Sequence, residues 1–423
     1  MKVLIVGSGG REHALAWKIA GSPRVTGISC APGNAGTRLL GDNVAIRDSD
    51  IPALAAFAES EKIDLTVVGP ELPLTLGIVD EFERRGLRIY GPSKKAAELE
   101  GSKIFAKQFM ERHKIPTGKF RVAESPEKAL TLLKSEEFGY PLVVKADGLA
   151  AGKGVIICHD AGEAEEAVKT IMVDRDFGDA GNRVLIEEFL RGKEVSFIVI
   201  SDGARALPLV TTMDHKAVFD DDRGPNTGGM GAISPSPHLT GDMFDEIMRT
   251  IILPTITRMR EEGRKFKGTL YAGLMLTEDG PKVLEYNVRF GDPETQPQML
   301  RLESDLVDIL LSAIDEDVLA KEARWTPQPS ACVILTSGGY PGHYEKGKVI
   351  RGLEEAARTP GITLFHAGTK YEGGQYLTNG GRIIAVCAME KTLGETMKKI
   401  YRTAATIRFE GVHYRRDIGT ART

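Results

Sequence analysis

The first 91 residues alternate short apolar runs with stretches of helical periodicity, and this pattern constrains the fold more than any other feature. Apolar runs at Val3–Val6, Val25–Ser29 and Leu65–Val68 are separated by helical patterns at Glu12–Ala20 and Ile51–Glu59. Strands that alternate with helices are typical of a parallel sheet, because parallel strands need crossover connections. The sequence therefore predicts an amino-terminal, doubly wound α/β unit.

Length and charge limit the possible classes of protein. A chain of 423 residues exceeds what one hydrophobic core usually spans, so we expect two to four packed units. The formal net charge of −4 and the sequence pI near 6.1 leave no basic excess, and we expect no nucleic-acid partner. The four cysteines form no CxxC pair, which favours a reduced protein without structural zinc.

The amino terminus, MKVLIVGSGG, has too few apolar residues before its glycines to form the hydrophobic region of a signal peptide. No run approaches the length needed to span a membrane. We therefore expect a soluble, cytoplasmic protein with no membrane partner.

Beyond Gly91 the pattern changes three times. A polar helical stretch over Ser93–His113 leads into a small α+β lobe, which begins near residue 120. A long segment, Asp214–Pro237, reads as irregular, and a hairpin follows with strands at Thr269–Leu276 and Lys282–Val288. After a proline-bearing linker, short apolar runs separated by glycine turns suggest a β-rich terminal domain.

The stretch Val143–Val155 reads VVKADGLAAGKGV and has the composition of a phosphate-binding loop. Glycines let backbone N–H groups approach an anion, and Lys145 and Lys153 supply positive charge. A Walker A loop has four residues between its glycines and a hydroxyl after its lysine, whereas Gly148 and Gly152 enclose three and Gly154 follows Lys153. The ligands of any magnesium ion must therefore lie elsewhere in the chain.

The turn Gly7-Ser8-Gly9-Gly10-Arg11-Glu12 follows the first predicted strand and opens a helix. Such a turn can hold a phosphate at the helix N-terminus, but Glu12 replaces the third glycine of the dinucleotide fingerprint. The guanidinium of Arg11 is suited to binding a small phosphoester. Glu71 follows another predicted strand and should lie at the same edge of the sheet. The alternative is a structural strand-to-helix turn without a ligand.

The run Glu187-Glu188-Phe189-Leu190, with Glu194 after it, ends another predicted strand. The backbone of this run could form hydrogen bonds with a nucleobase, while one of its carboxylates accepts hydrogen bonds from ribose hydroxyls. Taken alone, however, the run is better explained as solvated surface charge.

Glu285, Asn287 and Arg289 lie two residues apart on a predicted strand, so their side chains should share one face. A carboxylate and a carboxamide oxygen suit magnesium, and the guanidinium would meet an anion beside it. Leu284, Tyr286 and Val288 should fill the opposite face, which argues against the alternative of a solvent-facing polar row.

Asp214 and Lys216 precede a glycine-dense stretch, Gly224–Gly231. A carboxylate that recognises an ammonium group and backbone N–H groups that recognise a carboxylate could together bind a small zwitterion. The alternative is a flexible linker, but proline, threonine and methionine among the glycines match one poorly. Because the histidines lack metal-type spacing and no GxSxG elbow occurs, zinc and hydrolytic chemistry are disfavoured.

Together these motifs resemble the phosphoribosylamine–glycine ligase family of the ATP-grasp superfamily, whose members are also called glycinamide ribonucleotide synthetases. The similarity covers essentially the whole chain, and each motif alone is less specific than the ordered set. In chain order they are GSGGREHA, VGPE, LEGSK, KADGLAAGKGV, IEEFLRGKE, DHK, GPNTGGMGA, LEYNVRFGDPETQ, HAGT at His366 and TNGGR at Thr378.

The resemblance implies a Rossmann-like domain over residues 1–101, a two-lobed ATP-grasp unit over 102–326 with a mobile lobe at about 120–193, and a small β-rich domain over 327–423. It implies that glycine is joined to 5-phosphoribosylamine at the expense of ATP, through a glycyl phosphate, in de novo purine synthesis. It also implies Mg²⁺ or Mn²⁺, and we expect a monomer.

By resemblance, ATP would be bound by Lys103, Lys145, Gly152, Lys153, Gly154, Glu187, Glu188, Phe189, Leu190 and Glu194. The metal ligands would be Glu285 and Asn287. The substrates would be bound by Gly9, Gly10, Arg11, Glu12, Glu71, Asp214, Lys216, Thr227, Gly228, Gly229, Met230, Arg289 and Asp292, and the catalytic residues would be Arg289, Asp214 and Lys145.

Two other functions stay open. A related ATP-grasp enzyme would activate a different acid. A nucleotide-binding oxidoreductase built on the first unit is disfavoured, because the third fingerprint glycine is missing.

Overall fold

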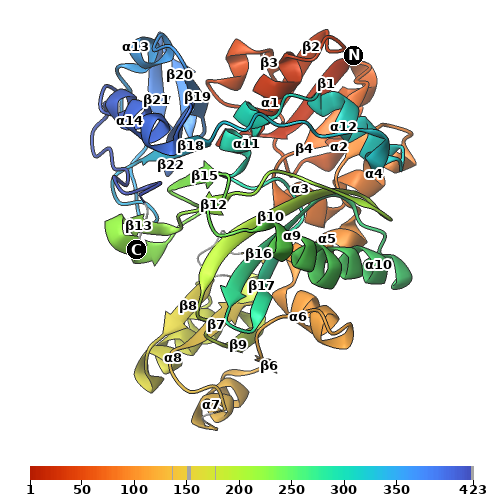
Figure 1. Cartoon of the computed structure of the whole chain (residues 1–423), viewed down its shortest axis with the longest axis vertical. Helices are drawn as coiled ribbons and strands as arrows, with labels where there is room; N and C mark the ends of the chain where they lie inside the picture. The colour runs from red at the N-terminus through yellow and green to blue at the C-terminus, as the bar shows by residue number, and fades with distance from the viewer. Residues whose placement is uncertain (136, 150–153, 177, 421–423) are drawn as a thin grey trace.

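The amino-terminal unit is a five-stranded parallel sheet in the order β3-β2-β1-β4-β5, which confirms the predicted doubly wound sheet. The computed structural model describes residues 1–135, 137–149, 154–176 and 178–420 (Figure 1). The strands of this sheet are β1 (Lys2–Gly7), β2 (Gly27–Pro32), β3 (Asp42–Asn43), β4 (Leu65–Val68) and β5 (Ile89–Tyr90). Its helices are α1 (Gly10–Ala20), α2 (Ile51–Ser60), α3 (Glu71–Leu76) and α4 (Ile78–Arg84).

The helical stretch predicted over Ser93–His113 is confirmed, and it consists of two helices, α5 (Lys94–Gly101) and α6 (Lys103–Arg112). Ser102 is extended (φ −138°, ψ 113°), and its hydroxyl accepts a hydrogen bond from the Phe105 N–H at 3.0 Å. This N-cap restarts the helix in a new direction, with Lys103 as its first residue.

The small lobe predicted between the first unit and the hairpin is present, as a four-stranded antiparallel sheet with its own core. Ser125 caps its first helix as predicted, accepting from the Lys128 N–H at 3.3 Å, with Pro126 in the first turn. In sheet order the strands are β6 (Phe120–Ala123), β9 (Val184–Glu188), β7 (Leu142–Ala146) and β8 (Val155–Cys158), and the helices are α7 (Pro126–Lys134) and α8 (Ala161–Val168), the latter continued by a π turn at Lys169–Val173.

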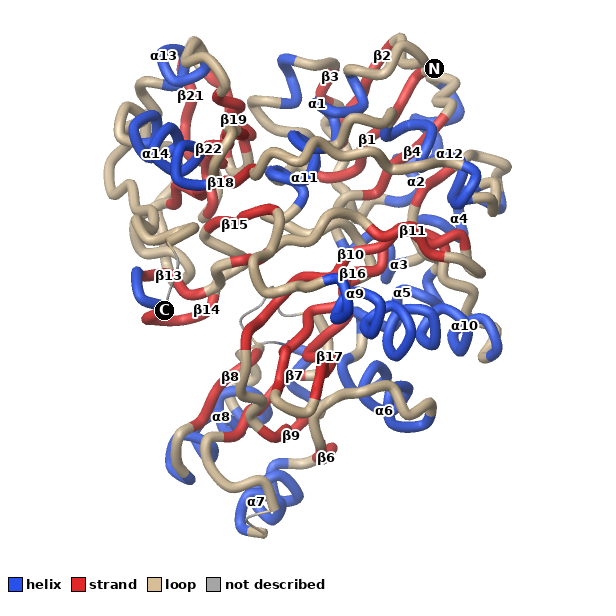
Figure 2. The backbone as a smooth tube through the Cα atoms, viewed as in Figure 1, coloured by secondary structure: helices blue, strands red, loops and turns tan. Residues whose placement is uncertain are grey.

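A second antiparallel sheet forms the middle of the molecule, in the order β11-β10-β16-β17 (Figure 2). Its last two strands are the predicted hairpin. The strands are β10 (Lys193–Asp202), β11 (Ala206–Pro208), β16 (Lys267–Thr277) and β17 (Gly280–Asn287). The helices α9 (Gly241–Ile247) and α10 (Leu253–Glu261), joined by a π turn at Met248–Ile252, are packed against this sheet through Phe244, Ile251 and Ile256.

The carboxyl-terminal sheet takes two strands from the segment that we predicted to be irregular. Its order is β12-β15-β18-β22-β19, with β12 (Met213–Asp214), β15 (Gly231–Ser234), β18 (Ser330–Thr336), β22 (Arg382–Met389) and β19 (Ile362–His366). The irregular reading of Asp214–Pro237 was wrong because these strands are too short to show a period of two, and β15 pairs with β18, about a hundred residues later. The predicted β-rich terminal domain is confirmed.

The remaining elements are distributed over the units. Two hairpins pair β13 (Ala217–Phe219) with β14 (Arg223–Asn226) and β20 (Thr369–Glu372) with β21 (Gln375–Thr378). The helices are α11 (Thr295–Arg301), α12 (Leu306–Ile314), α13 (Leu353–Ala357) and α14 (Leu393–Ala404), and 3₁₀ turns lie at Thr37–Leu39, Gly178–Asn182, Asp220–Asp222 and Val318–Ala320.

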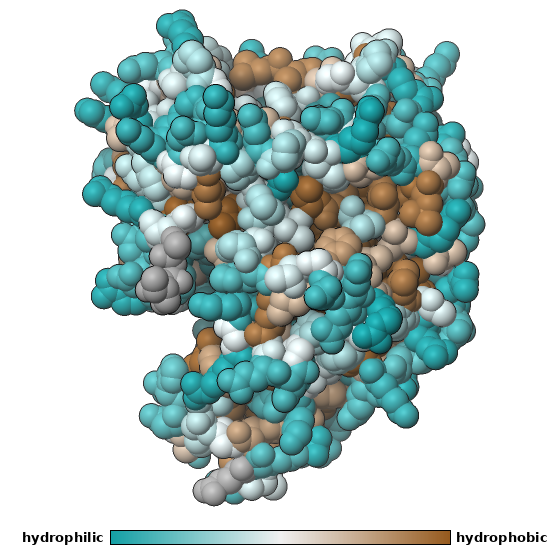
Figure 3. Space-filling model, viewed as in Figure 1, coloured by the Kyte–Doolittle hydropathy of each residue, from teal (hydrophilic) through white to brown (hydrophobic). Residues whose placement is uncertain are grey.

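The layout leaves the small lobe standing apart from the rest. In Figure 1 this lobe lies at the bottom, the amino-terminal sheet at the upper right and the carboxyl-terminal sheet at the upper left. Figure 3 shows a largely polar face with a hollow at the left, above the small lobe. None of the described helices combines the length and apolarity needed to cross a membrane.

Candidate active site

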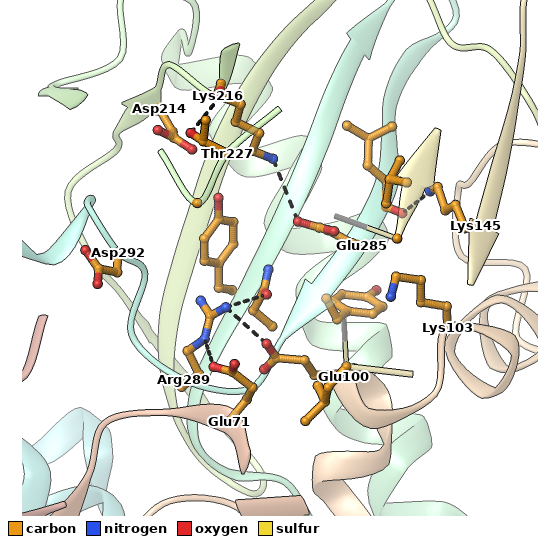
Figure 4. A pocket seen from close by; sticks show the side chains of 18 of the residues that line it. Glu71, Glu100, Lys103, Lys145, Asp214, Lys216, Thr227, Glu285, Arg289 and Asp292 are labelled. Carbon is orange, nitrogen blue, oxygen red and sulfur yellow. Dashed lines mark hydrogen bonds and ion pairs between the residues drawn. The ribbon is translucent and has the colours of Figure 1, made fainter. Parts of the chain in front are cut away.

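A cavity of about 450 Å³ lies where the small lobe, the central sheet and both terminal units meet. Fourteen residues selected from the sequence contribute to its lining: Arg11, Glu71, Lys103, Lys145, Gly154, Glu187, Asp214, Lys216, Thr227, Gly228, Glu285, Asn287, Arg289 and Asp292. Most of them appear in Figure 4, where Lys103 and Lys145 lie on the same side of the Glu285 carboxylate of the central sheet. Segments more than two hundred residues apart in the chain thus meet in one charged site.

Two lysines and one carboxylate form a buried cluster on the lobe side. The Nζ atoms of Lys145 and Lys107 lie 3.0 Å and 2.8 Å from the same oxygen of Glu187, Oε2. Burial raises the pKa of Glu187, but the two ammonium groups outweigh it and hold that pKa below its usual value. The other oxygen, Oε1, is buried without a hydrogen-bond partner. Glu187 therefore serves first as a counter-ion for the lysines.

Lys103 approaches the cavity from the first turn of α6. Its Nζ donates to the Gly148 carbonyl at 2.7 Å, on the segment that leads into the glycine-rich loop. Burial lowers the pKa of Lys103, while Glu285 opposes that effect. The break at Ser102 is what directs this lysine into the site. Gly152 and Lys153 lie outside the described residues, and Gly154 lies at the cavity wall.

Glu285, Asn287 and Arg289 all line the cavity, and the Arg289 Nη2 donates to the Asn287 Oδ1 at 2.9 Å, so the structure brings these three predicted side chains together. The expectation that Leu284 lies on the opposite face was wrong, because Gly273 pairs with Glu285 and Leu274 with Val283, which leaves Leu284 as an extra residue in a bulge. Leu284 borders the cavity instead, and its carbonyl accepts from Lys145 at 3.3 Å.

The oxygen atoms on this face are suited to a divalent cation. Burial raises the pKa of Glu285, but Lys216, Lys145 and Lys103 outweigh it and lower the pKa to about 2, so the carboxylate is ionised. The Asn287 Oδ1 accepts from Arg289 at 2.9 Å and keeps a second lone pair. Nowhere among the described residues do three or more His, Cys, Asp or Glu side chains converge to hold a metal ion. The donor set fits magnesium, which keeps several waters.

Arg289 is held between two carboxylates. Its Nε lies 3.2 Å from Glu71 and its Nη2 lies 3.1 Å from Glu100. Burial raises the pKa of both acids. At Glu71 the guanidinium groups of Arg289 and Arg11 outweigh burial and lower the pKa to about 2, whereas at Glu100 burial prevails and the pKa rises to about 7. Two neighbouring carboxylates thus differ strongly in acidity.

A third cluster surrounds Asp214. Its Oδ1 is buried without a hydrogen-bond partner, and burial together with the charge of Glu294 raises the pKa of Asp214 well above its usual value. The Lys216 Nζ forms an ion pair with Glu194 and lies 3.7 Å from the Glu285 carboxylate. Burial lowers the pKa of Lys216, but the two carboxylates outweigh burial and raise that pKa. Asp214 itself lines the cavity, and a carboxylate there can accept hydrogen bonds from an ammonium group.

The stretch Thr227–Met230 forms a hydrogen-bonded turn and not a flexible linker. The Thr227 N–H and hydroxyl both donate to the Lys216 carbonyl at 2.8 Å. Gly229 has φ +111°, and a Cβ there would lie 2.3 Å from Pro293 and 2.7 Å from the Asp214 Oδ1. Gly229 and Met230 pack behind the cavity wall, and Met230 is completely buried. Only Thr227 and Gly228 of this stretch line the cavity.

At the amino-terminal turn, Arg11 lines the cavity and Glu12 does not. Glu12 is buried, pairs with Arg11 at 2.6 Å and accepts from the Gly9 N–H, so it caps its own helix. A Cβ on Gly10 would lie 2.8 Å from the Gln296 amide, and one on Gly9 would lie 3.4 Å from Asp292. The turn therefore packs directly against the Asp292 segment.

Nine predicted residues do not line the cavity: Gly9, Gly10, Glu12, Glu188, Phe189, Leu190, Glu194, Gly229 and Met230. Four of them, Glu188–Leu190 and Glu194, lie on or beside the segment that connects β9 of the small lobe to β10 of the central sheet.

Sequence reasoning missed polar residues of the cavity, among them Glu100, Lys107, Tyr271, Glu294, Tyr340, Tyr344 and Arg382. Lys107 lies four residues after Lys103 on one helix face, a spacing that could have revealed it. The Tyr271 hydroxyl donates to Glu294 at 2.6 Å, and this pairing joins residues on different elements, for which the sequence carries no local signal.

Comparisons with known proteins agree over the whole chain. The family descriptions that match are "Phosphoribosylglycinamide synthetase, N domain" at residues 1–100, "Phosphoribosylglycinamide synthetase, ATP-grasp (A) domain" at 101–295 and "Phosphoribosylglycinamide synthetase, C domain" at 330–421. A phosphoribosylamine–glycine ligase from Vibrio vulnificus is 52% identical over 422 residues, covering 99% of this chain and 98% of the relative.

Solved structures give the same picture. A phosphoribosylamine–glycine ligase from Thermotoga maritima matches with a TM-score of 0.85 at 34% identity, over 99% of this chain and 100% of that chain. The biotin carboxylase domain of a Hydrogenobacter thermophilus 2-oxoglutarate carboxylase, solved with MgADP and bicarbonate, matches with a TM-score of 0.74 at 18% identity, over 97% and 91%. That second likeness shows the fold alone.

Proposed function

The chain belongs to the phosphoribosylglycinamide synthetase family, and from that premise we propose that it ligates glycine to 5-phosphoribosylamine with ATP, forming glycinamide ribonucleotide, ADP and phosphate in purine biosynthesis. It is an ATP-dependent ligase with an ATP-grasp fold. The roles of individual residues, the metal and the reaction steps are our proposals.

Lys145 and Lys103 bind the phosphates of ATP, together with the glycine loop Gly152–Gly154. Both lysines reach the cavity from the lobe side, and their charge is only partly balanced by Glu187 and Glu285. The run Glu187–Leu190 and Glu194 hold adenine and ribose. This assignment is supported by their position at the crossing between the two sheets that enclose the cavity.

Glu285 and Asn287 hold a divalent cation, Mg²⁺ or Mn²⁺. The support is chemical, since both offer oxygen atoms to the cavity and Glu285 is ionised. When bound, the cation neutralises part of the charge of the triphosphate and orients it.

Glycine binds between Asp214, Lys216 and the turn Thr227–Met230. The Asp214 carboxylate accepts the ammonium group, and Arg289 meets the carboxylate and later the acyl phosphate. 5-Phosphoribosylamine lies against the turn Gly9–Glu12, with Glu71 and Asp292 beside it. Arg11 supplies the positive charge that its phosphate needs.

The reaction is balanced in two steps. A glycine carboxylate oxygen attacks the γ-phosphorus, the bond from that phosphorus to the β,γ-bridging oxygen breaks, and ADP leaves. The amine of phosphoribosylamine then attacks the carbonyl carbon of glycyl phosphate, the carbon–oxygen bond breaks, phosphate leaves and the nitrogen loses one proton. The glycyl phosphate needs shelter from water, which closure of the small lobe would provide.

We further propose that the protein acts in the cytoplasm as a monomer. Its substrates are small molecules, and we propose neither a nucleic-acid nor a membrane partner.

One observation carries the proposal: the Asp214 carboxylate lines the same cavity as the lysines and the Glu285 carboxylate. ADP formation should depend on glycine, and hydroxylamine should trap glycyl phosphate as a hydroxamate. A panel of amino acids and other small carboxylates distinguishes this activity from that of a related ATP-grasp ligase. No ADP above background with glycine and freshly generated phosphoribosylamine would refute the proposed function.

A further inference from the structure

Arg382 reaches the cavity from β22 of the carboxyl-terminal sheet and joins two segments that are distant in sequence. Its Nη1 donates to the carbonyls of Gly228 at 2.5 Å, Gly229 at 3.4 Å and Asp292 at 2.8 Å. Its Nη2 lies 2.8 Å from the Asp292 Oδ2. One planar guanidinium therefore holds the glycine-rich turn and the Asp292 segment at a fixed separation.

The close packing leaves this arrangement little freedom. A Cβ on Gly228 would lie 3.2 Å from the guanidinium carbon of Arg382. The Gly228 N–H donates to the hydroxyl of Tyr340, a second residue of the carboxyl-terminal unit, at 3.1 Å. On the other segment, Pro293 borders Gly229, and the carbonyl of Pro293 accepts from Cys332 Sγ on β18 at 3.5 Å. Side chains of the carboxyl-terminal sheet thus fix both segments.

The charges around Arg382 are consistent with a guanidinium that stays in place. Its side chain is 20% exposed, and that of Asp292 is 13% exposed. Burial lowers the pKa of Arg382, but Asp292 and the nearby Tyr340, Asp214 and Glu294 outweigh it and raise the pKa. Because its four acceptors are three backbone carbonyls and one acidic side chain, all on turns, loss of Arg382 would free the turns and not a regular element.

We propose that Arg382 is a positioning residue that aligns the two substrate sites of the ligation. These are the glycine site at the turn Gly228–Gly229 and the phosphoribosylamine site at Asp292. This inference rests on the proposed function, which assigns those two segments to the two substrates. Arg382 acts through Gly228, Gly229 and Asp292. If the two sites shift apart, glycyl phosphate still forms, but the amine meets its carbonyl carbon less often and water consumes it.

The test compares ADP with glycinamide ribonucleotide formed in the same reaction. The wild-type enzyme should give a ratio near one. Arg382→Met should lower the rate of ligation about tenfold to a hundredfold, since small misplacements of reacting groups have effects of that size. It should also raise the ratio of ADP to ligated product severalfold, because activation continues while transfer fails. Added guanidinium chloride at millimolar concentration should bring the ratio back toward one.

Two further variants complete the design. Arg382→Lys keeps the charge without the planar fork, and its ratio should lie between those of the wild type and Arg382→Met. Arg301→Met is the matched control, because this buried arginine donates to the Ser234 hydroxyl at 2.8 Å and the Thr326 carbonyl at 3.1 Å, away from the cavity. Its ratio should stay near one even if its melting temperature falls.

The outcomes separate cleanly. A wild-type ligase whose Arg382 variants keep a ratio near one overturns the inference and leaves the proposed function standing. A higher KM for phosphoribosylamine alone, with the ratio unchanged, would mean that Arg382 contacts substrate and would also overturn it. If Arg382→Met does not fold, the ratio of Arg382→Lys decides. A wild-type enzyme without glycine-dependent ADP formation refutes the proposed function itself.

Discussion

Replacement of Arg289 by methionine gives the most quantitative prediction, because it leaves two carboxylates in the cavity wall without their shared counter-ion. The guanidinium lies 3.2 Å from Glu71 and 3.1 Å from Glu100, and the three side chains are 16%, 28% and 8% exposed. Two unit charges about 4 Å apart attract by about 4 kcal/mol at an effective dielectric constant near 20. Removing one partner of a buried pair costs about 3–5 kcal/mol. We expect a loss of that size in the free energy of unfolding.

The loss should depend on pH with a definite sign. Burial raises the pKa of Glu100 to about 7 while Arg289 is present, and without the guanidinium that pKa rises further. A carboxyl group whose pKa is higher in the folded than in the unfolded chain stabilises the fold at low pH, and this contribution is lost as the pH rises through the folded-state pKa. Between about pH 6 and about pH 8 the variant should therefore lose stability more steeply than the wild type, by about 1 kcal/mol.

The assay is urea-induced unfolding of the nucleotide-free, metal-free enzyme, followed by intrinsic fluorescence at both pH values. Arg84→Met is the control, because Arg84 pairs with Glu81 on the exposed face of α4 and should leave the unfolding midpoint nearly unchanged. A loss for Arg289→Met below about 1 kcal/mol, or an equal loss at both pH values, would refute the reasoning.

Three other outcomes are expected. Glu285→Ala should lower turnover at limiting magnesium at least about a hundredfold without changing the melting temperature, because loss of a residue that only supports a metal ligand already costs about 10–100-fold. Unchanged activity at limiting magnesium would contradict the assignment of Glu285 as a metal ligand. Lys145→Met should weaken ATP binding about tenfold or more in equilibrium dialysis, whereas Lys128→Met on the exposed side of the lobe should not, and equal affinities would contradict the phosphate role. Burial lowers the pKa of His13 to about 3 and that of His366 to about 4, so each contributes stability above about pH 6.5 that is lost as the pH falls. In urea titrations between about pH 6 and about pH 4, His13→Gln should therefore show a slope that is shallower by about 1.4 kcal/mol per pH unit, and an unchanged slope would contradict this.

Local signals allowed much of the fold to be predicted. The parallel sheet, the small lobe, the Ser125 cap and the hairpin that presents Glu285 all depend on periodicity or capping within a few residues. The division into domains at 101/102 and 326/327 stays a prediction.

Long-range pairing explains what the sequence did not reveal. β15 is a strand because it pairs with β18, and β12 in turn pairs with β15. Leu284 borders the cavity only because of a bulge in the pairing of β17 with β16. The same holds for the site. Glu100 was part of a recognised motif, but its role as the partner of Arg289 depends on a contact 189 positions away along the chain. Arg382 likewise gains its role from turns contributed by two other segments.

The central claim is that a glycine carboxylate oxygen becomes bonded to the γ-phosphorus of ATP. Glycine labelled with ¹⁸O in its carboxylate tests this directly, by mass spectrometry of the phosphate released when phosphoribosylamine is present. If glycyl phosphate forms, one labelled oxygen passes to phosphate when the carbon–oxygen bond breaks. Unlabelled phosphate, released at the rate of ligation, would contradict the account.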